Sequence, residues 1–154
     1  MLPLGSVVSG LMVWRDVDFG VEAPGLAVDS AWSAVLPLLT TPRCTALDYA
    51  NEQGGPGESR FYFVVRLDGW KLDLSIWTNG VPEGVEAWQE SLAGRLDGDT
   101  RLTILRLKDA WHRLPPYPYT VGGYEICVAV LDHGVRTLDE LDAYLAQRSL
   151  PTRH

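Results

Sequence analysis

The sequence predicts an α+β fold, in which a small mixed β-sheet is backed by helices and followed by a helical C-terminal part. Alternation of apolar and polar residues, which is typical of strands, dominates residues 1–80, whereas helical periodicity dominates residues 85–148. The length of 154 residues, of which 46% are hydrophobic, provides one sizeable core. We therefore expect a single domain, with a sheet-rich core over residues 1–80 and a helical part over residues 85–148.

Two short strands with a helical turn between them are expected at the start. Residues 2–5 predict a strand, residues 7–12 a helical turn, and residues 16–21 a second strand. The apolar residues of this second strand share one face. Asp16 and Asp18 share the opposite face, because side chains alternate along a strand.

A helix and a third strand are expected next. Asp29 is a suitable N-cap for the helix, and apolar residues follow it at helical spacing: Trp32, Val35, Leu36 and Leu39. Pro37 is expected to kink this helix or to end it early, because proline lacks the amide hydrogen. Residues 43–49 then predict a strand.

A β-hairpin is the strongest local signal in the chain. Strand-forming residues at 60–67 and 70–77 are joined by Asp68-Gly69, a preferred two-residue hairpin turn, and a glycine-rich turn at 54–57 precedes them. Apolar and polar residues alternate along the second strand, so Asp73 is expected to point away from its apolar face. An acidic residue inside such a strand makes Asp73 a candidate functional residue.

The second half predicts helices. They are expected at residues 85–96, 99–114 and 121–133, with a last helix running from Thr137 to Ala146. Gly134 ends the third of these helices, and Thr137 with Glu140 forms a capping box for the fourth.

The charge balance restricts the class of ligand. A formal net charge of −7 repels the phosphate backbone of nucleic acids, and no concentrated basic patch offsets it. Nucleic acid is therefore not expected as a partner. An acidic surface better suits a metal ion or a cationic small molecule.

The cysteines and the N-terminus indicate a reduced compartment. Cys44 and Cys127 lie far apart and lack neighbours at metal-ligand spacing, which argues against a disulfide scaffold and a zinc site. The start of the chain has no positively charged leader, and no apolar run is long enough to cross a membrane. We expect a cytoplasmic protein without a membrane anchor.

Three features of the first half occur in a recognisable order. Gly5-Ser6 follows a short strand, an Asp-x-Asp motif follows after nine intervening residues, and a third carboxylate lies on a later strand. This pattern resembles the nucleotidyltransferase superfamily. Five residues fall on matching positions: Gly5, Ser6, Asp16, Asp18 and Asp73. The resemblance extends from Leu4 to about Trp77, and the helical half is compatible with the variable C-terminal bundle of that family.

The resemblance implies a role for each of these residues. Asp16 and Asp18 would bind Mg²⁺ together with the triphosphate of a nucleotide. Gly5 would allow the backbone to approach phosphate oxygens, and the Ser6 hydroxyl would bind them. Asp73 would complete the metal site or accept the proton of the acceptor hydroxyl.

The chain also departs from the family pattern. Many members have a helix before the Gly-Ser strand, and a basic residue often follows the Gly-Ser; this chain has neither at these positions. Lys71, on the expected face of Asp73, is a candidate for triphosphate binding, and a cross-strand charge pair is the alternative. For Lys108, a side chain packed along Trp111 with its ammonium at the surface is favoured over a phosphate contact. Trp14, Trp70 and Trp77 flank the expected site in sequence, as core residues or as stacking surfaces for a ring.

The leading hypothesis is an enzyme, a Mg²⁺-dependent nucleotidyltransferase. It would transfer a nucleoside monophosphate from an NTP to a hydroxyl of a small, cationic acceptor, as aminoglycoside- and lincosamide-modifying enzymes do. The alternative is a non-catalytic or partner-dependent protein of the same fold, such as a nucleotide-binding module or a toxin–antitoxin component, with a protein partner or as a homodimer. A third hypothesis is an α+β binding domain with an accidental motif, in which the three aspartates lie far apart.

Overall fold

The computed structural model describes residues 1–54 and 59–154, and it confirms the α+β fold. Most of the glycine-rich turn expected at residues 54–57 lies outside the described residues. The chain forms two compact units. The first contains Met1–Gly10 and Arg15–Ser91, and the second contains Leu11–Trp14 and Leu92–His154.

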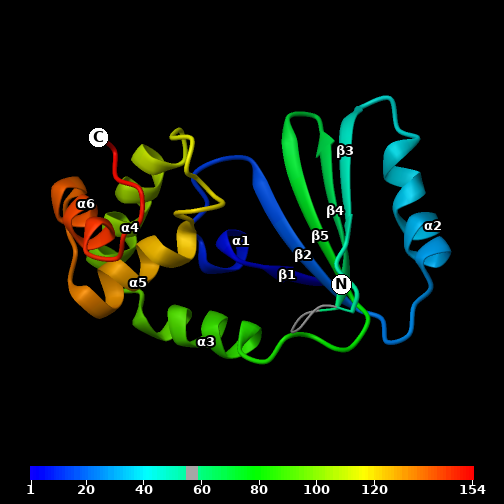
Figure 1. Cartoon of the computed structure of the whole chain (residues 1–154), viewed down its shortest axis with the longest axis horizontal. Helices are drawn as coiled ribbons and strands as arrows, with labels where there is room; N and C mark the ends of the chain where they lie inside the picture. The colour runs from blue at the N-terminus through cyan, green and yellow to red at the C-terminus, as the bar shows by residue number, and fades with distance from the viewer. Residues whose placement is uncertain (55–58) are drawn as a thin grey trace. The chain divides into compact units, whose positions relative to one another are not determined.

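The first unit contains a five-stranded mixed sheet in the order β1-β2-β5-β4-β3 (Figure 1). The strands are β1 (Leu2–Leu4), β2 (Asp16–Glu22), β3 (Cys44–Asn51), β4 (Arg60–Leu67) and β5 (Trp70–Trp77). β2 and β5 are parallel, and the other neighbouring strands are antiparallel. A short helix, α1 (Ser6–Ser9), separates β1 from β2.

The hairpin of β4 and β5 has the predicted bounds and turn. Leu67 pairs with Trp70, and the two turn residues both have positive φ, 52° at Asp68 and 76° at Gly69. This combination matches the right-handed twist of the paired strands. The turn thereby fixes the register that places Asp73 on one face of the sheet.

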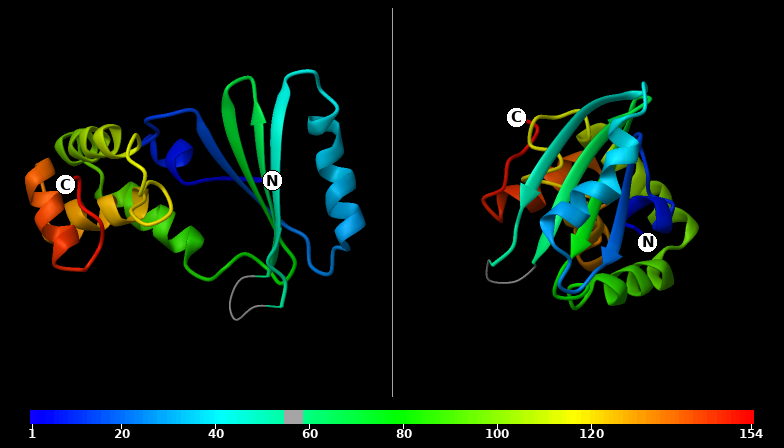
Figure 2. Two further views of the ribbon diagram at one scale, coloured as in Figure 1. Left: turned by 45° about the horizontal axis from the view of Figure 1, so that its top comes forward. Right: turned by 90° about the vertical axis from the view of Figure 1, so that its right-hand side faces the viewer.

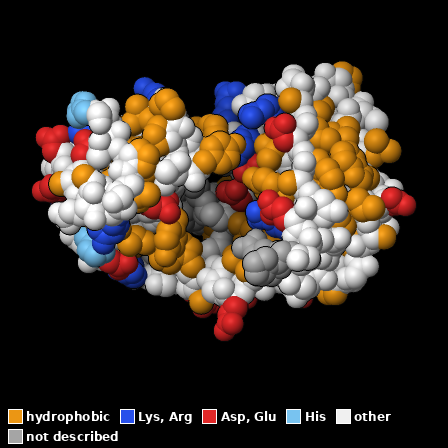
Figure 3. All heavy atoms as spheres, in the orientation of Figure 1, with side chains coloured by type: hydrophobic (Ala, Val, Ile, Leu, Met, Phe, Trp, Pro, Cys, Tyr) orange, Lys and Arg blue, Asp and Glu red, His pale blue; other side chains and the backbone are white. Residues whose placement is uncertain are grey.

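One face of the sheet packs against α2 (Val28–Leu39), which lies over this face in Figure 2. The buried core between helix and sheet consists of Ala31, Val35, Phe61, Phe63, Val65 and Ile76. Burying each of the larger side chains contributes about 1.5–3 kcal/mol. In Figure 3, hydrophobic side chains gather on the α2 side of the sheet, where the partly buried Trp32 and Tyr49 join the core.

The structure corrects three expectations for α2. Ala27 occupies the N-cap position, while Asp29 lies in the first turn, where its charge still suits the helix dipole. Leu36 is 53% exposed, because Ala31 and Val35 face the sheet instead. The helix continues past Pro37 to Leu39, since a proline this close to the C-terminus interrupts little remaining helix.

The helices of the second half follow the predicted pattern with shifted ends. They are α3 (Val85–Arg95), α4 (Gly98–Trp111), α5 (Gly123–His133) and α6 (Leu138–Ala146). The N-cap of α4 is Asp97, which accepts a hydrogen bond from the amide of Thr100 at 2.7 Å. Gly134 ends α5 with φ 67°, and the Thr137–Glu140 capping box is confirmed.

The second unit has a core of its own. Its fully buried large side chains include Ile104, Trp111, Ile126, Leu141 and Leu145. Within the described parts of the chain, none of the helices has the length and apolar character needed to span a membrane.

Candidate functional site

Asp16, Asp18 and Asp73 lie on adjacent strands of the first unit. β2 and β5 run parallel with Asp16 opposite Lys71 and Asp18 opposite Asp73. Directly paired residues point to the same side of a sheet, and this side is the one opposite α2. The structure therefore brings the three carboxylates together, contrary to what the accidental-motif hypothesis expects.

Lys71 is the cation of this cluster. Its Nζ donates to Asp73 Oδ2 at 2.5 Å and to Asp16 Oδ1 at 3.4 Å. Lys71 and Asp73 are each only 8% exposed. Burial disfavours the charged amine, but the hydrogen bond to Asp73 and the charges of Asp73 and Asp16 outweigh it and raise the pKa of Lys71. The side chain is therefore held as an ammonium ion.

Asp18 is a carboxylate whose ionised form is disfavoured by its surroundings. Burial, followed by the charges of Asp16 and Asp73, raises its pKa to about 7. The second oxygen of Asp73, Oδ1, is buried and accepts no hydrogen bond. The protein therefore neutralises the negative charge of the cluster only in part, and it leaves one carboxylate oxygen without a hydrogen-bond donor.

These donors fit a divalent cation by their chemistry. Mg²⁺ prefers oxygen ligands, and Asp73 Oδ1 is a carboxylate oxygen without a hydrogen-bond partner. Among the residues with described positions, however, no three His, Cys, Asp or Glu side chains are arranged to hold a metal ion. The ammonium of Lys71 instead contacts two of the carboxylates.

Gly5 lies directly against Asp18. Its φ of 62° and ψ of −132° suit glycine alone, and a Cβ there would lie 2.8 Å from Asp18 Oδ2. The Gly5 amide donates to Gln89 Oε1 at 3.1 Å. Ser6 follows as the first residue of α1. The close neighbour of Gly5 in this structure is the Asp18 carboxylate, and the predicted approach of Gly5 to phosphate oxygens stays a prediction.

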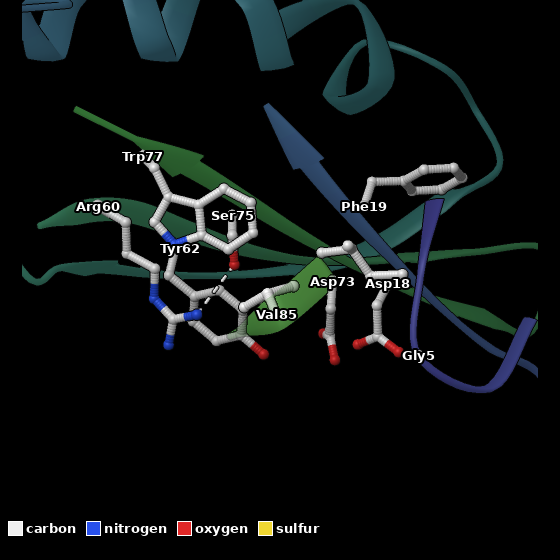
Figure 4. Close-up of a pocket in the computed structure, with 10 residues that line it drawn as sticks. Gly5, Asp18, Phe19, Arg60, Tyr62, Asp73, Ser75, Trp77 and Val85 are labelled. Carbon is white, nitrogen blue, oxygen red and sulfur yellow. Dashed lines mark hydrogen bonds between the residues drawn. The ribbon is translucent and has the colours of Figure 1, made fainter. Parts of the chain in front are cut away.

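A pocket of about 350 Å³ opens beside Asp18 and Asp73 (Figure 4). It is lined by Leu4, Gly5, Asp18, Phe19, Arg60, Tyr62, Asp73, Ser75, Trp77 and Val85. The size is in the range of small-molecule sites. The pocket places a polar and aromatic wall next to the two aspartates.

Arg60, Tyr62 and Ser75 form a connected part of this wall that sequence reasoning missed. Arg60 Nη1 donates to Ser75 Oγ at 2.9 Å, its Nε donates to Glu52 Oε2 at 2.5 Å, and its guanidinium lies 4.6 Å from the centre of the Tyr62 ring. The hairpin register pairs Tyr62 with Ser75, on the face of Asp73. Extending the predicted alternation from the second hairpin strand to the first would have identified both Arg60 and Tyr62.

The Tyr62 hydroxyl faces the pocket in Figure 4. Burial, followed by the charge of Asp73, raises the pKa of Tyr62. The phenol therefore remains protonated around neutral pH, as a donor beside Asp73.

The other sequence candidates lie in different surroundings. Lys108 is 2% exposed, and its Nζ donates to the carbonyl of Leu11 at 2.8 Å, so its ammonium is buried and not at the surface as expected. Trp14 packs near Tyr117 in the second unit, and Trp70 lies beneath Arg15. Trp77 lines the pocket.

Compared with known proteins, the chain matches no family model and no curated protein sequence.

Proposed function

We propose that this chain is a Mg²⁺-dependent nucleotidyltransferase, which transfers a nucleoside monophosphate from an NTP to a hydroxyl of a small acceptor and releases pyrophosphate. The observation that carries the proposal is the register of β2 and β5. It brings Asp73 beside Asp16 and Asp18, although 54 residues separate Asp73 from Asp18 in the chain. The glycine against Asp18 adds the second part of the motif.

Asp16, Asp18 and Asp73 are the residues that would hold Mg²⁺. The ion would supply positive charge to offset the charge that develops on the transferring phosphoryl group. The protein supplies the donors on a rigid pair of strands, which fixes their positions before the ligand arrives. Gly5 and Ser6 would bind phosphate oxygens at the end of β1.

Asp73 is suited to accept the proton of the acceptor hydroxyl. It lines the pocket and has a buried oxygen without a hydrogen-bond partner. An acceptor in the pocket would bring its hydroxyl to the Asp73 carboxylate, while Tyr62 and Ser75 offer hydroxyl groups and Trp77 offers an apolar surface. The two pocket aspartates and the net charge of −7 favour an acceptor with a positive charge.

A second candidate function is metal-independent nucleotide binding, alone or with a partner protein. One observation favours it: the ammonium of Lys71 already pairs with Asp16 and Asp73, so the site is partly neutralised without a metal ion. The two functions differ in whether a nucleotide needs Mg²⁺ to bind.

Thermal unfolding with ATP, GTP, CTP or UTP, each with and without Mg²⁺, tests the proposal without knowledge of the acceptor. A nucleotide at 100 times its Kd adds about 2.7 kcal/mol to stability. We expect a Mg²⁺-dependent rise in Tm with at least one nucleotide, and its loss in Asp18→Asn. Asp48→Asn is the matched control, because Asp48 is an exposed acidic residue on the edge strand β3.

Two results would contradict the proposal. A rise in Tm that is the same with and without Mg²⁺ would favour the metal-independent binding module. If none of the four nucleotides raises the Tm, both candidate functions are rejected for the isolated chain.

A further inference from the structure

We propose that Lys71 is the counter-ion of the carboxylate cluster. Its ammonium group and a divalent cation cannot occupy the cluster at the same time. The inference rests on the proposed function, since it concerns the cation that this function requires. It assigns Lys71 the role of setting how tightly the site binds a divalent cation in the absence of nucleotide.

The contacts of Lys71 carry the inference. The oxygens that its Nζ contacts, Asp73 Oδ2 and Asp16 Oδ1, belong to two of the three carboxylates assigned to the cation. Mg²⁺ binds oxygen ligands at about 2.0–2.1 Å. A cation this close to the same oxygens would lie next to the ammonium, and two positive charges at such a distance repel one another. Binding of the cation therefore requires Lys71 to withdraw.

The burial of the cluster explains why a counter-ion is present. Lys71 and Asp73 are both only 8% exposed, and an isolated charge at such a position is costly. The two side chains lie two residues apart on β5, so both face the same side and neutralise one another. Asp16, opposite Lys71 on β2, completes the arrangement.

The lysine side chain is long and flexible enough for its ammonium group to move away from the carboxylates. Its ammonium is a point charge on a flexible four-carbon stem, unlike the planar fork of arginine. In the proposed function a triphosphate arrives with the cation, and its oxygens offer Lys71 new acceptors in place of the carboxylates. Cation and nucleotide then bind cooperatively, because the cation displaces the Lys71 ammonium from the carboxylates and the phosphate oxygens of the nucleotide become its new acceptors.

Binding of Mn²⁺ alone, measured by electron paramagnetic resonance without nucleotide, tests the exclusion. We expect weak binding to the wild type and at least tenfold tighter binding to Lys71→Met, which keeps much of the side-chain length and removes the charge. Lys71→Arg, which keeps the charge, should remain as weak as the wild type.

Arg66→Met is the matched control for net charge. Arg66 pairs directly with Lys71 across the hairpin and is exposed, so this variant removes one positive charge from the neighbouring position. We expect less than a twofold change in Mn²⁺ affinity. An equal gain in Arg66→Met and Lys71→Met would overturn the inference, since net charge alone would then account for it.

The remaining outcomes separate the inference from the proposed function. Unchanged Mn²⁺ affinity in Lys71→Met, together with Mg²⁺-dependent nucleotide binding in the wild type, overturns the inference and leaves the function standing. Failure of both proteins to bind Mn²⁺, without nucleotide binding by the wild type, rejects the function and the inference with it. Lys71→Gln serves as a second variant if Lys71→Met does not fold, because its amide can still donate to Asp73; it should also bind Mn²⁺ more tightly than the wild type.

Discussion

The two faces of the sheet in the first unit show how differently side chains of one strand are used. On β5, Ile76 joins the apolar core beneath α2, whereas Lys71 and Asp73 form a buried ion pair on the opposite face. The apolar face gains stability from burial of hydrophobic area. The charged face holds three carboxylates together with one ammonium, so part of its electrostatic cost remains uncompensated.

The largest effect is expected for Asp73→Asn, which changes the charged face alone. In the proposed function Asp73 accepts the proton of the acceptor hydroxyl, so its replacement should lower the rate of transfer by about 10²–10⁴-fold, the range typical of general base catalysis. The measurement is Mg²⁺-dependent pyrophosphate release with the best acceptor from a screen of cationic, hydroxyl-bearing molecules. Full activity of this variant would remove Asp73 from the mechanism.

Phe63→Ala changes the apolar face and should act on stability instead. Phe63 is fully buried against α2, and such truncations cost about 3–5 kcal/mol. Urea unfolding measures the loss. The variant should still bind nucleotide with wild-type affinity at a temperature where it is folded. A large loss of affinity in the folded protein would show that the two faces are not independent.

Asp18→Asn should stabilise the metal-free protein at neutral pH. Since burial and neighbouring charges raise the pKa of Asp18 from 3.8 to about 7, its contribution to stability is fully present below about pH 4 and is lost as the pH rises through 7. The asparagine variant does not ionise, so it should be more stable than the wild type by roughly 2–4 kcal/mol at pH 8.

Urea unfolding between pH 4 and pH 8, in the presence of EDTA, measures this difference. The stability advantage of Asp18→Asn should grow across the interval, while that of the control Asp48→Asn should stay near zero. A constant difference between Asp18→Asn and the wild type over this range would contradict the electrostatic account of the site.

Gly5→Ala should have the smallest effect of the four, about 1–3 kcal/mol in stability. The added Cβ would meet Asp18 Oδ2, and the positive φ adds strain. Gly25→Ala is the matched control, because Gly25 has φ 71° but open space around its Cβ position. The difference in unfolding free energy between the two variants isolates the contact with Asp18; equal values would show that this contact is unimportant.

The sequence predicts the local parts of this site well. The Asp-Gly turn and the alternation along residues 70–77 place Asp73 on the polar face, and the structure confirms both. Short-range patterns suffice here because a two-residue turn determines the hairpin register. The same reasoning gives the capping box of α6 and the glycine that ends α5.

Contacts between distant segments could not be predicted from local patterns, and only the family resemblance placed Asp73 with Asp16 and Asp18. Nothing local to Asp16 indicates that it lies opposite Lys71, since this register depends on how the whole sheet assembles. Lys108 shows the same limit, because its buried bond to Leu11 joins residues 97 positions apart. Leu36 fits the helical spacing but is exposed, because only part of an apolar stripe fits against the sheet.

The parallel pairing of β2 with β5 also determines the order in which the cluster can assemble. Lys71 and Asp73 come together within one strand of a local hairpin, whereas Asp16 is 55 residues from Lys71 and joins only when a long loop closes. Contacts of high sequence separation form slowly in folding. We therefore expect Lys71 and Asp73 to pair before Asp16 and Asp18 join them, so that the three carboxylates do not come together without a positive charge.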